Sequence, residues 1–98
     1  MCGATKGGPS TEGLDLAEAA VVQGVVVRDG EPVSNAYVRL LDGGGEFTAE
    51  VPTSATGQFR FFAAPGQWTV RALAPKADPV ERQVVAQLGE VADLEVAI

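Results

Sequence analysis

The sequence contains no histidine and only one cysteine, Cys2, among its 98 residues. Without histidine there is no Ser/His/Asp or Cys/His nucleophile, no imidazole acid or base and no histidine-built zinc site. One cysteine forms neither an internal disulfide nor a cysteine-only metal site, which fits a reducing cytoplasm. We therefore expect no metal and no cofactor, and the composition argues against an enzyme.

Positive charge and long apolar runs are also scarce. The sequence has seven Lys and Arg residues and 13 Asp and Glu residues, which gives a net charge of -6. No local cluster of basic residues offsets this negative charge. Such a chain repels phosphate backbones, so we expect no nucleic-acid partner. No apolar run approaches the roughly 18 to 20 residues that cross a bilayer, and the first residues lack the pattern of a secretory signal. We expect no membrane partner and a cytoplasmic location.

Short β-branched and aromatic runs do recur from Ala20 onward, separated by turn residues at intervals of roughly 8 to 12. This spacing is typical of a β-sandwich or barrel in a single domain. It predicts an all-β sandwich over residues 20–98 and a flexible, glycine-rich tail over residues 1–19. The seven predicted strands are 20–28, 36–41, 46–51, 58–63, 67–74, 80–87 and 91–98.

Alternation along these strands separates a core face from an outer face. The predicted core contains Ala36, Val38, Leu40, Phe59, Phe61, Trp68, Val70, Ala72, Leu94, Val96 and Ile98. Trp68 is expected to be its largest member.

The opposite face gathers three arginines and two aromatic residues. These residues are Tyr37, Arg39, Arg60, Phe62 and Arg71. They share one surface if strands 58–63 and 67–74 form a hairpin around Pro65 and Gly66. Two interpretations stay open: a patch that binds a partner or a small anion, or cross-strand pairing with acidic residues. The acidic residues available are Glu46, Glu50, Asp93 and Glu95.

The stretch DGGGE, at 42–46, offers two carboxylates separated by three glycines. Calcium requires more oxygen ligands converging on one point. This stretch is therefore interpreted as a flexible connection between strands, not as a metal site.

Three pieces between Gln23 and Pro75 resemble the carboxypeptidase regulatory-like domain: QGVVVRDGEPVSNAYVRLL, TSATGQFRF and APGQWTVRALAP. The resemblance implies an Ig-like or transthyretin-like β-sandwich, a fold that serves as a non-catalytic module in many proteins. The phrase EFTAEVPTSATGQFRFFAAPGQWTVRAL, with MCG at the start, also resembles a family of small actinobacterial proteins of unknown function. That family is sometimes labelled thiosulfate sulfurtransferase. This second resemblance implies a rhodanese-type sulfurtransferase as a partner.

Cys2 is the only nucleophile that could serve such a system. A rhodanese-type site needs a cationic loop around its persulfide, and here only Lys6 lies within reach of the thiol in the sequence. The sequence therefore predicts no independent sulfurtransferase activity. Removal of Met1 would leave an ammonium group that, with Lys6, lowers the pKa of the Cys2 thiol. Two hypotheses follow: a non-enzymatic accessory protein that carries sulfur on Cys2, or a protein-interaction module in which Cys2 is incidental.

Overall fold

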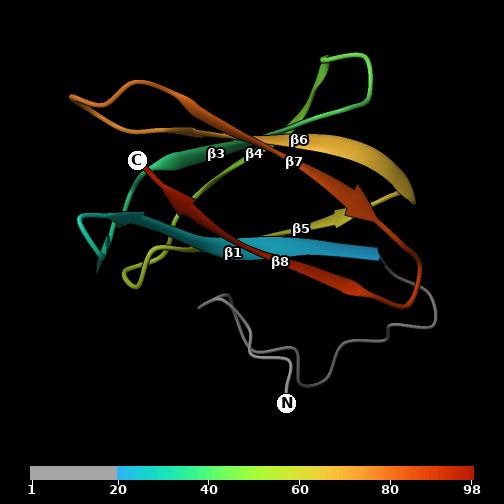
Figure 1. Cartoon of the computed structure of the whole chain (residues 1–98), viewed down its shortest axis with the longest axis horizontal. Coiled ribbons are helices and arrows are strands. Elements are labelled where there is room, and N and C mark those ends of the chain that lie inside the picture. The colour runs from blue at the N-terminus through green and yellow to red at the C-terminus, as the bar shows by residue number, and fades with distance from the viewer. Residues whose placement is uncertain (1–19) are drawn as a thin grey trace.

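The computed structural model describes residues 20–98, which form eight strands and no helix. Figure 1 shows these strands stacked as two sheets, one above the other. The strands are β1 (Ala20–Arg28), β2 (Glu31–Pro32), β3 (Tyr37–Leu41), β4 (Phe47–Pro52), β5 (Gln58–Ala63), β6 (Gly66–Leu73), β7 (Val80–Ala86) and β8 (Val91–Ala97). The all-β sandwich is therefore confirmed, and the ends of all seven predicted strands agree within one residue.

The eighth strand, β2, is not among the seven predicted strands, and it contains Pro32. Asp29 and Gly30 both have positive φ, and they reverse the chain so that Pro32 lies opposite Val27. The ladder bond is made by the next residue, since Val33 N–H donates to the Val26 carbonyl at 2.9 Å. A proline without its own N–H is tolerated at such an edge position.

The first sheet, sheet A, is built around β1. Strand β5 runs antiparallel to β1 over Ala20–Val25, and β2 continues along the same edge. Strand β8 occupies the other edge and is parallel to β1, with Val21 opposite Val91 and Val27 opposite Ala97. Sheet B is antiparallel throughout, in the order β4-β3-β6-β7. Consecutive strands β5 and β6 thus belong to different sheets, so the hairpin expected around Pro65 and Gly66 is wrong.

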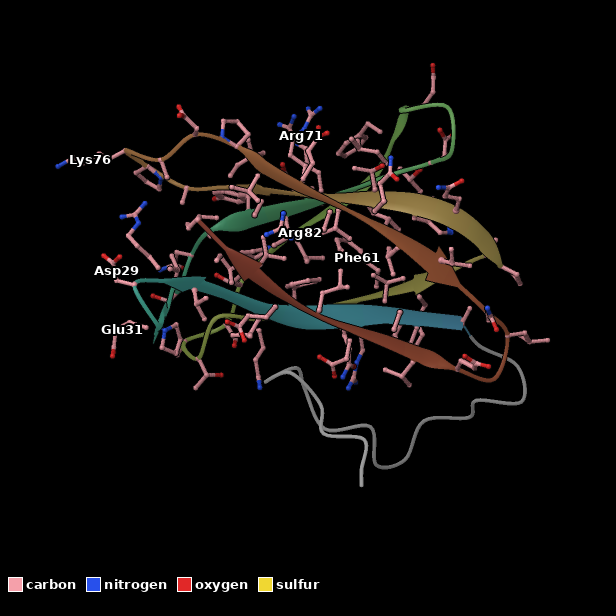
Figure 2. All side chains as sticks on the ribbon, viewed as in Figure 1. Asp29, Glu31, Phe61, Arg71, Lys76 and Arg82 are labelled. Atoms are coloured by element: carbon pink, nitrogen blue, oxygen red, sulfur yellow. The ribbon has the colours of Figure 1, made fainter. Side chains whose placement is uncertain are left out.

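The core lies between the two sheets. Phe61 points into this space, whereas Arg71 points away from it (Figure 2). The predicted core residues that are fully enclosed are Ala36, Val38, Leu40, Phe59, Phe61, Val70, Ala72 and Val96. Leu94, Ile98 and Trp68 pack against this cluster while staying partly exposed. Trp68 sits at the margin of the core because its indole N–H donates to the Ala64 carbonyl at 2.8 Å.

One buried hydroxyl fixes the loop that leads into β3. Thr53 Oγ1 accepts from the Ala36 N–H at 3.0 Å and donates to the Val33 carbonyl at 2.6 Å. The Thr53 N–H also donates to the Ala36 carbonyl at 2.7 Å. Polar groups of the backbone that leave water must find partners, and these three bonds supply partners for four of them. They hold the chain entering β3 against the chain leaving β4.

Candidate functional site

The five residues expected on one surface are divided between the two outer faces of the sandwich. Tyr37, Arg39 and Arg71 lie on the outer face of sheet B, because their neighbours along β3 and β6 fill the core. Arg60 and Phe62 lie on the outer face of sheet A, opposite Gln23 and Val21 of β1. The single patch is therefore wrong, and the cause is the crossing from β5 to β6 between sheets.

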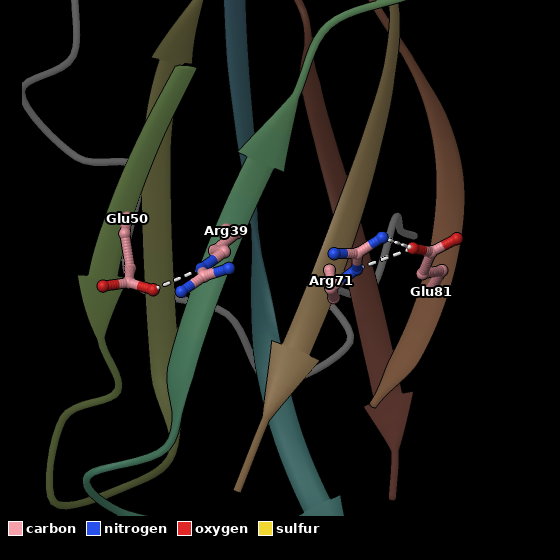
Figure 3. Close-up of polar contacts among 4 residues, drawn as sticks. All are labelled: Arg39, Glu50, Arg71 and Glu81. Carbon is pink, nitrogen blue, oxygen red and sulfur yellow. Dashed lines mark hydrogen bonds and ion pairs between the residues drawn. The ribbon is translucent and has the colours of Figure 1, made fainter. Parts of the chain in front are cut away.

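The outer face of sheet B carries a ladder of four charges, shown in Figure 3. Glu50, Arg39, Arg71 and Glu81 lie opposite one another across β4, β3, β6 and β7. Arg39 Nε donates to Glu50 Oε2 at 2.6 Å, and Arg71 Nε donates to Glu81 Oε2 at 2.6 Å. The two arginines are direct cross-strand neighbours, and like charges in that position repel. The carboxylate of each flanking glutamate neutralises the charge of one arginine and so reduces this repulsion.

Two aromatic side chains border this ladder. The Arg39 guanidinium lies over the Phe47 ring, 5.9 Å from its centroid, in a cation–π contact. Phe47 is 62% exposed and Tyr37 is 52% exposed, so both rings face solvent. Arginine and tyrosine are enriched among the residues that dominate binding energy at protein interfaces. We call Tyr37, Arg39, Phe47 and Arg71 the sheet B patch; three of the four belong to the predicted surface, and Phe47 is added by its contact with Arg39.

The outer face of sheet A has a different, partly buried ladder. Arg60 Nε donates to Gln23 Oε1 at 2.8 Å, and Gln23 Nε2 donates to Asp93 Oδ2 at 3.0 Å. The chain of bonds runs from β5 across β1 to β8, and the Gln23 side chain is completely buried. Gln23 thus links a cation on one edge strand to a carboxylate on the other.

The expected acidic partners are confirmed only in part. Glu50 pairs with Arg39 as the sequence allowed, and Asp93 connects to Arg60 through Gln23. Glu81 was missed as the partner of Arg71, although it follows from the register of β6 and β7. That register depends on the loop at 74–79, whose geometry carries no clear sequence signal.

The remaining candidate groups give no site within the described residues. Asp42 Oδ1 accepts the N–H groups of Gly44 at 2.9 Å and Glu46 at 3.0 Å, so this carboxylate organises its own loop. Within residues 20–98 no three Cys, Asp or Glu side chains gather as metal ligands would. The same range holds no helix long and apolar enough to span a membrane. Cys2, Lys6 and the tail expected at 1–19 lie outside the described residues.

A family of unknown function, DUF1416, has a sequence model that matches residues 2–98. The chain belongs to this family. An uncharacterized protein of Mycolicibacterium smegmatis is 64% identical over 62 residues, covering 62% of this chain and 69% of that protein. The uncharacterized protein Rv0814c of Mycobacterium tuberculosis is 50% identical over 95 residues, covering 93% of this chain and 95% of its own length.

Solved structures of distant proteins share the fold. The major pilin subunit BcpA of Bacillus cereus gives a TM-score of 0.71 at 20% identity, covering 82% of this chain and 28% of that one. A dioxygenase domain from Streptomyces sp. SirexAA-E gives a TM-score of 0.64 at 14% identity. The match covers 83% of this chain and 80% of that domain's chain. At these identities the likeness concerns the β-sandwich alone, since one fold hosts unrelated functions.

Proposed function

We propose that this DUF1416 protein is a non-enzymatic protein-interaction module that binds its partner through the sheet B patch. The observation that carries the proposal is the arrangement of Arg39 and Arg71, which lie side by side and are each held by a glutamate. A guanidinium fixed in advance loses less side-chain entropy on binding than a free one. The exposed rings of Tyr37 and Phe47 beside it supply apolar contact area.

The test compares variants of the two outer faces. Arg71→Glu and Tyr37→Ala alter the sheet B patch, and Arg60→Glu alters the opposite face of the sandwich as a matched control. Proteins retained by the wild-type protein from an extract of a bacterium that encodes it are purified, and their affinities for each variant are measured by calorimetry. We expect affinity to fall by about tenfold or more for the sheet B variants and to be unchanged for Arg60→Glu. A partner that binds all variants equally contradicts the proposal.

A second candidate function concerns the thiol of Cys2 and rests on the extent of the family. Its sequence model begins at residue 2, so the segment that carries Cys2 lies within the region that defines the family. We propose that a rhodanese-type sulfurtransferase passes sulfane sulfur to this thiol in the cytoplasm, where a thiol stays reduced. The Cys2 thiolate would attack the outer sulfur of the enzyme persulfide. The S–S bond would break, the enzyme would recover its thiolate, and Cys2 would hold the persulfide.

Intact mass measurement separates this second function from the first. The protein is incubated with thiosulfate and a purified rhodanese-type sulfurtransferase, and sulfur loading adds about 32 Da, one sulfur atom. We expect the gain to disappear in Cys2→Ser and to persist in Arg71→Glu. An unchanged mass while the enzyme consumes thiosulfate and releases sulfite would exclude the carrier function.

A further inference from the structure

The outer face of sheet B is built of rows that cross its strands, and an apolar row lies on each side of the four-charge ladder. On one side, Tyr37 of β3 lies opposite Pro52 of β4 and Leu73 of β6. On the other side, Leu41 of β3 lies opposite Phe47 of β4. These positions on β3 alternate with those that fill the core. Because the rows are two residues apart along β3, each apolar row lies about 6.6 Å from the ladder.

The two arginines at the centre of the ladder keep donors that face each other. Arg39 and Arg71 each donate through Nε to the glutamate on their outer side, and Arg71 Nη2 also contacts Glu81 Oε2. In the part of the chain that the structure describes, these glutamates are the polar side chains with which the two arginines pair. Figure 3 shows one nitrogen of each guanidinium, with no dashed bond, turned toward the other arginine. Donors of like charge thus meet across β3 and β6.

We propose that this surface binds an extended segment of the partner that carries one carboxylate side chain, with an apolar side chain two residues before it and another two residues after it. This inference rests on the proposed function, because it specifies what the sheet B patch recognises. In an extended chain every second side chain points to the same side, with about 6.6 Å between them. The rows of sheet B have the same spacing. The carboxylate therefore lies over Arg39 and Arg71 while its apolar neighbours lie over Tyr37 and Phe47.

The charges around the two arginines favour a carboxylate over a phosphate group. The two arginines and two glutamates of the ladder sum to zero, and the whole chain carries a net charge of -6. A carboxylate brings one negative charge and accepts charge-assisted bonds from both guanidinium groups, which also reduces their repulsion. A phosphate group carries about 1.5 to 2 negative charges near pH 7, and the glutamates on both sides repel it more strongly.

The apolar rows supply the second part of the recognition. The rings of Tyr37 and Phe47 are 52% and 62% exposed, so each has apolar surface that a partner can cover. Removing this surface from water favours binding. An acidic residue without apolar neighbours makes only exposed ionic contacts, which are weak in water. We therefore expect the acid and its two apolar neighbours to be recognised together.

Defined peptides test the proposal on the full chain. Four nine-residue peptides with blocked ends have leucine at their third and seventh positions and serine or threonine elsewhere. Three of them carry glutamate, glutamine or phosphoserine at the fifth position, and the last carries its glutamate at the sixth position instead. Dissociation constants are measured from chemical-shift titrations. We expect the peptide with the central glutamate to bind about tenfold more tightly than the glutamine peptide, and more tightly than the other two. Equal affinities, tightest binding of the phosphoserine peptide, or no binding of any peptide overturns the proposal.

Variants of the protein show which residues recognise the acid. In Arg39→Gln with Arg71→Gln, we expect the preference for glutamate over glutamine to fall from about tenfold to about one. Arg60→Gln, on the outer face of sheet A, is the matched control and should keep the preference. Tyr37→Ala should weaken both peptides by a similar factor. If the preference survives in the double variant, another cation binds the carboxylate and the proposal is wrong.

Failure of this inference can be told apart from failure of the proposed function. If the peptides show no preference for the acid, while the partner captured from the extract still binds Arg71→Glu more weakly, the patch binds by other chemistry and only this inference is wrong. If the captured partner binds all variants equally, the proposed function itself fails. Signals of Tyr37 and Arg39 that shift on dilution without peptide would identify a second copy of the chain as the occupant, which also overturns the inference.

Discussion

The smallest residue of β1, Gly24, determines whether the first and last strands can pair. A methyl group built on Gly24 would lie 2.1 Å from the Leu94 carbonyl oxygen and 3.0 Å from Phe59 Cζ. The backbone of β8 therefore approaches β1 more closely than any side chain allows. From the sequence alone, this glycine only weakens a valine-rich strand. Its role depends on pairing between residues 70 positions apart, which no local pattern reveals.

Gly24→Ala should accordingly destabilise the fold. Because the clash is with backbone on one side and a buried ring on the other, neither neighbour can move aside without disturbing β8 or the core. We expect a loss of about 2 to 3 kcal/mol in the free energy of unfolding, measured by urea titration. Gly43→Ala is the control, since the nearest atom to its new methyl group, the Gln67 carbonyl oxygen, is 3.6 Å away. Equal midpoints for the two variants would refute this account of the β1–β8 contact.

At the scale of strands, local pattern was a good guide to where each strand lies and a poor guide to its partners. Alternation located β1 and β5 to the residue because both have dense β-branched or aromatic runs between turn residues. It also placed Arg39 and Arg71 outward. It gave no information on which sheet β5 and β6 would join, because a side chain points outward in the same way from either sheet. The predicted single patch was wrong because β5, with Arg60 and Phe62, and β6, with Arg71, belong to different sheets.

The sheet B ladder yields a prediction about paired charges. In Glu50→Gln with Glu81→Gln, Arg39 and Arg71 remain direct neighbours with no compensating carboxylate. Each exposed ion pair contributes only about 0.5 kcal/mol, but the double variant adds arginine repulsion, so we expect a loss of about 1 kcal/mol. Urea titrations at low salt and at about 1 M NaCl should show the loss shrinking as the Debye length falls to roughly 3 Å.

The control for this experiment removes the same amount of charge elsewhere. Glu31→Gln with Glu90→Gln alters two carboxylates outside the ladder, and its stability should stay within about 0.5 kcal/mol of wild type. Adding Arg71→Gln to the ladder variant should recover part of the lost stability, because it removes the repulsion. If the ladder and control variants lose the same stability, the effect comes from net charge and not from the arrangement of the four residues.

Across the whole molecule, the two outer faces have different chemistry. Sheet B presents charges and exposed rings, whereas the centre of sheet A is buried and carries the Arg60–Gln23–Asp93 ladder between valines of β1. In sheet A the parallel pairing of β8 with β1 makes β1 an interior strand with a full neighbour on each edge. The strand order also means that the fold is complete only when the last strand has joined the first. Contacts of such long sequence separation are costly to form and come late in folding.

The contribution of β8 can be measured by placing one charge on either of two edge strands. Val96 on β8 is fully buried, whereas Val85 on β7 is 55% exposed. Val96→Asp puts an unpaired carboxylate in the core beside β1, and we expect it to abolish cooperative unfolding in circular dichroism. Val96→Ala, which introduces no charge, should cost about 2 kcal/mol. Val85→Asp should stay within about 0.5 kcal/mol of wild type, because its side chain already contacts water. A folded Val96→Asp protein with wild-type stability would mean that the sandwich closes without β8, and β1 would then be an edge strand available to pair with another chain.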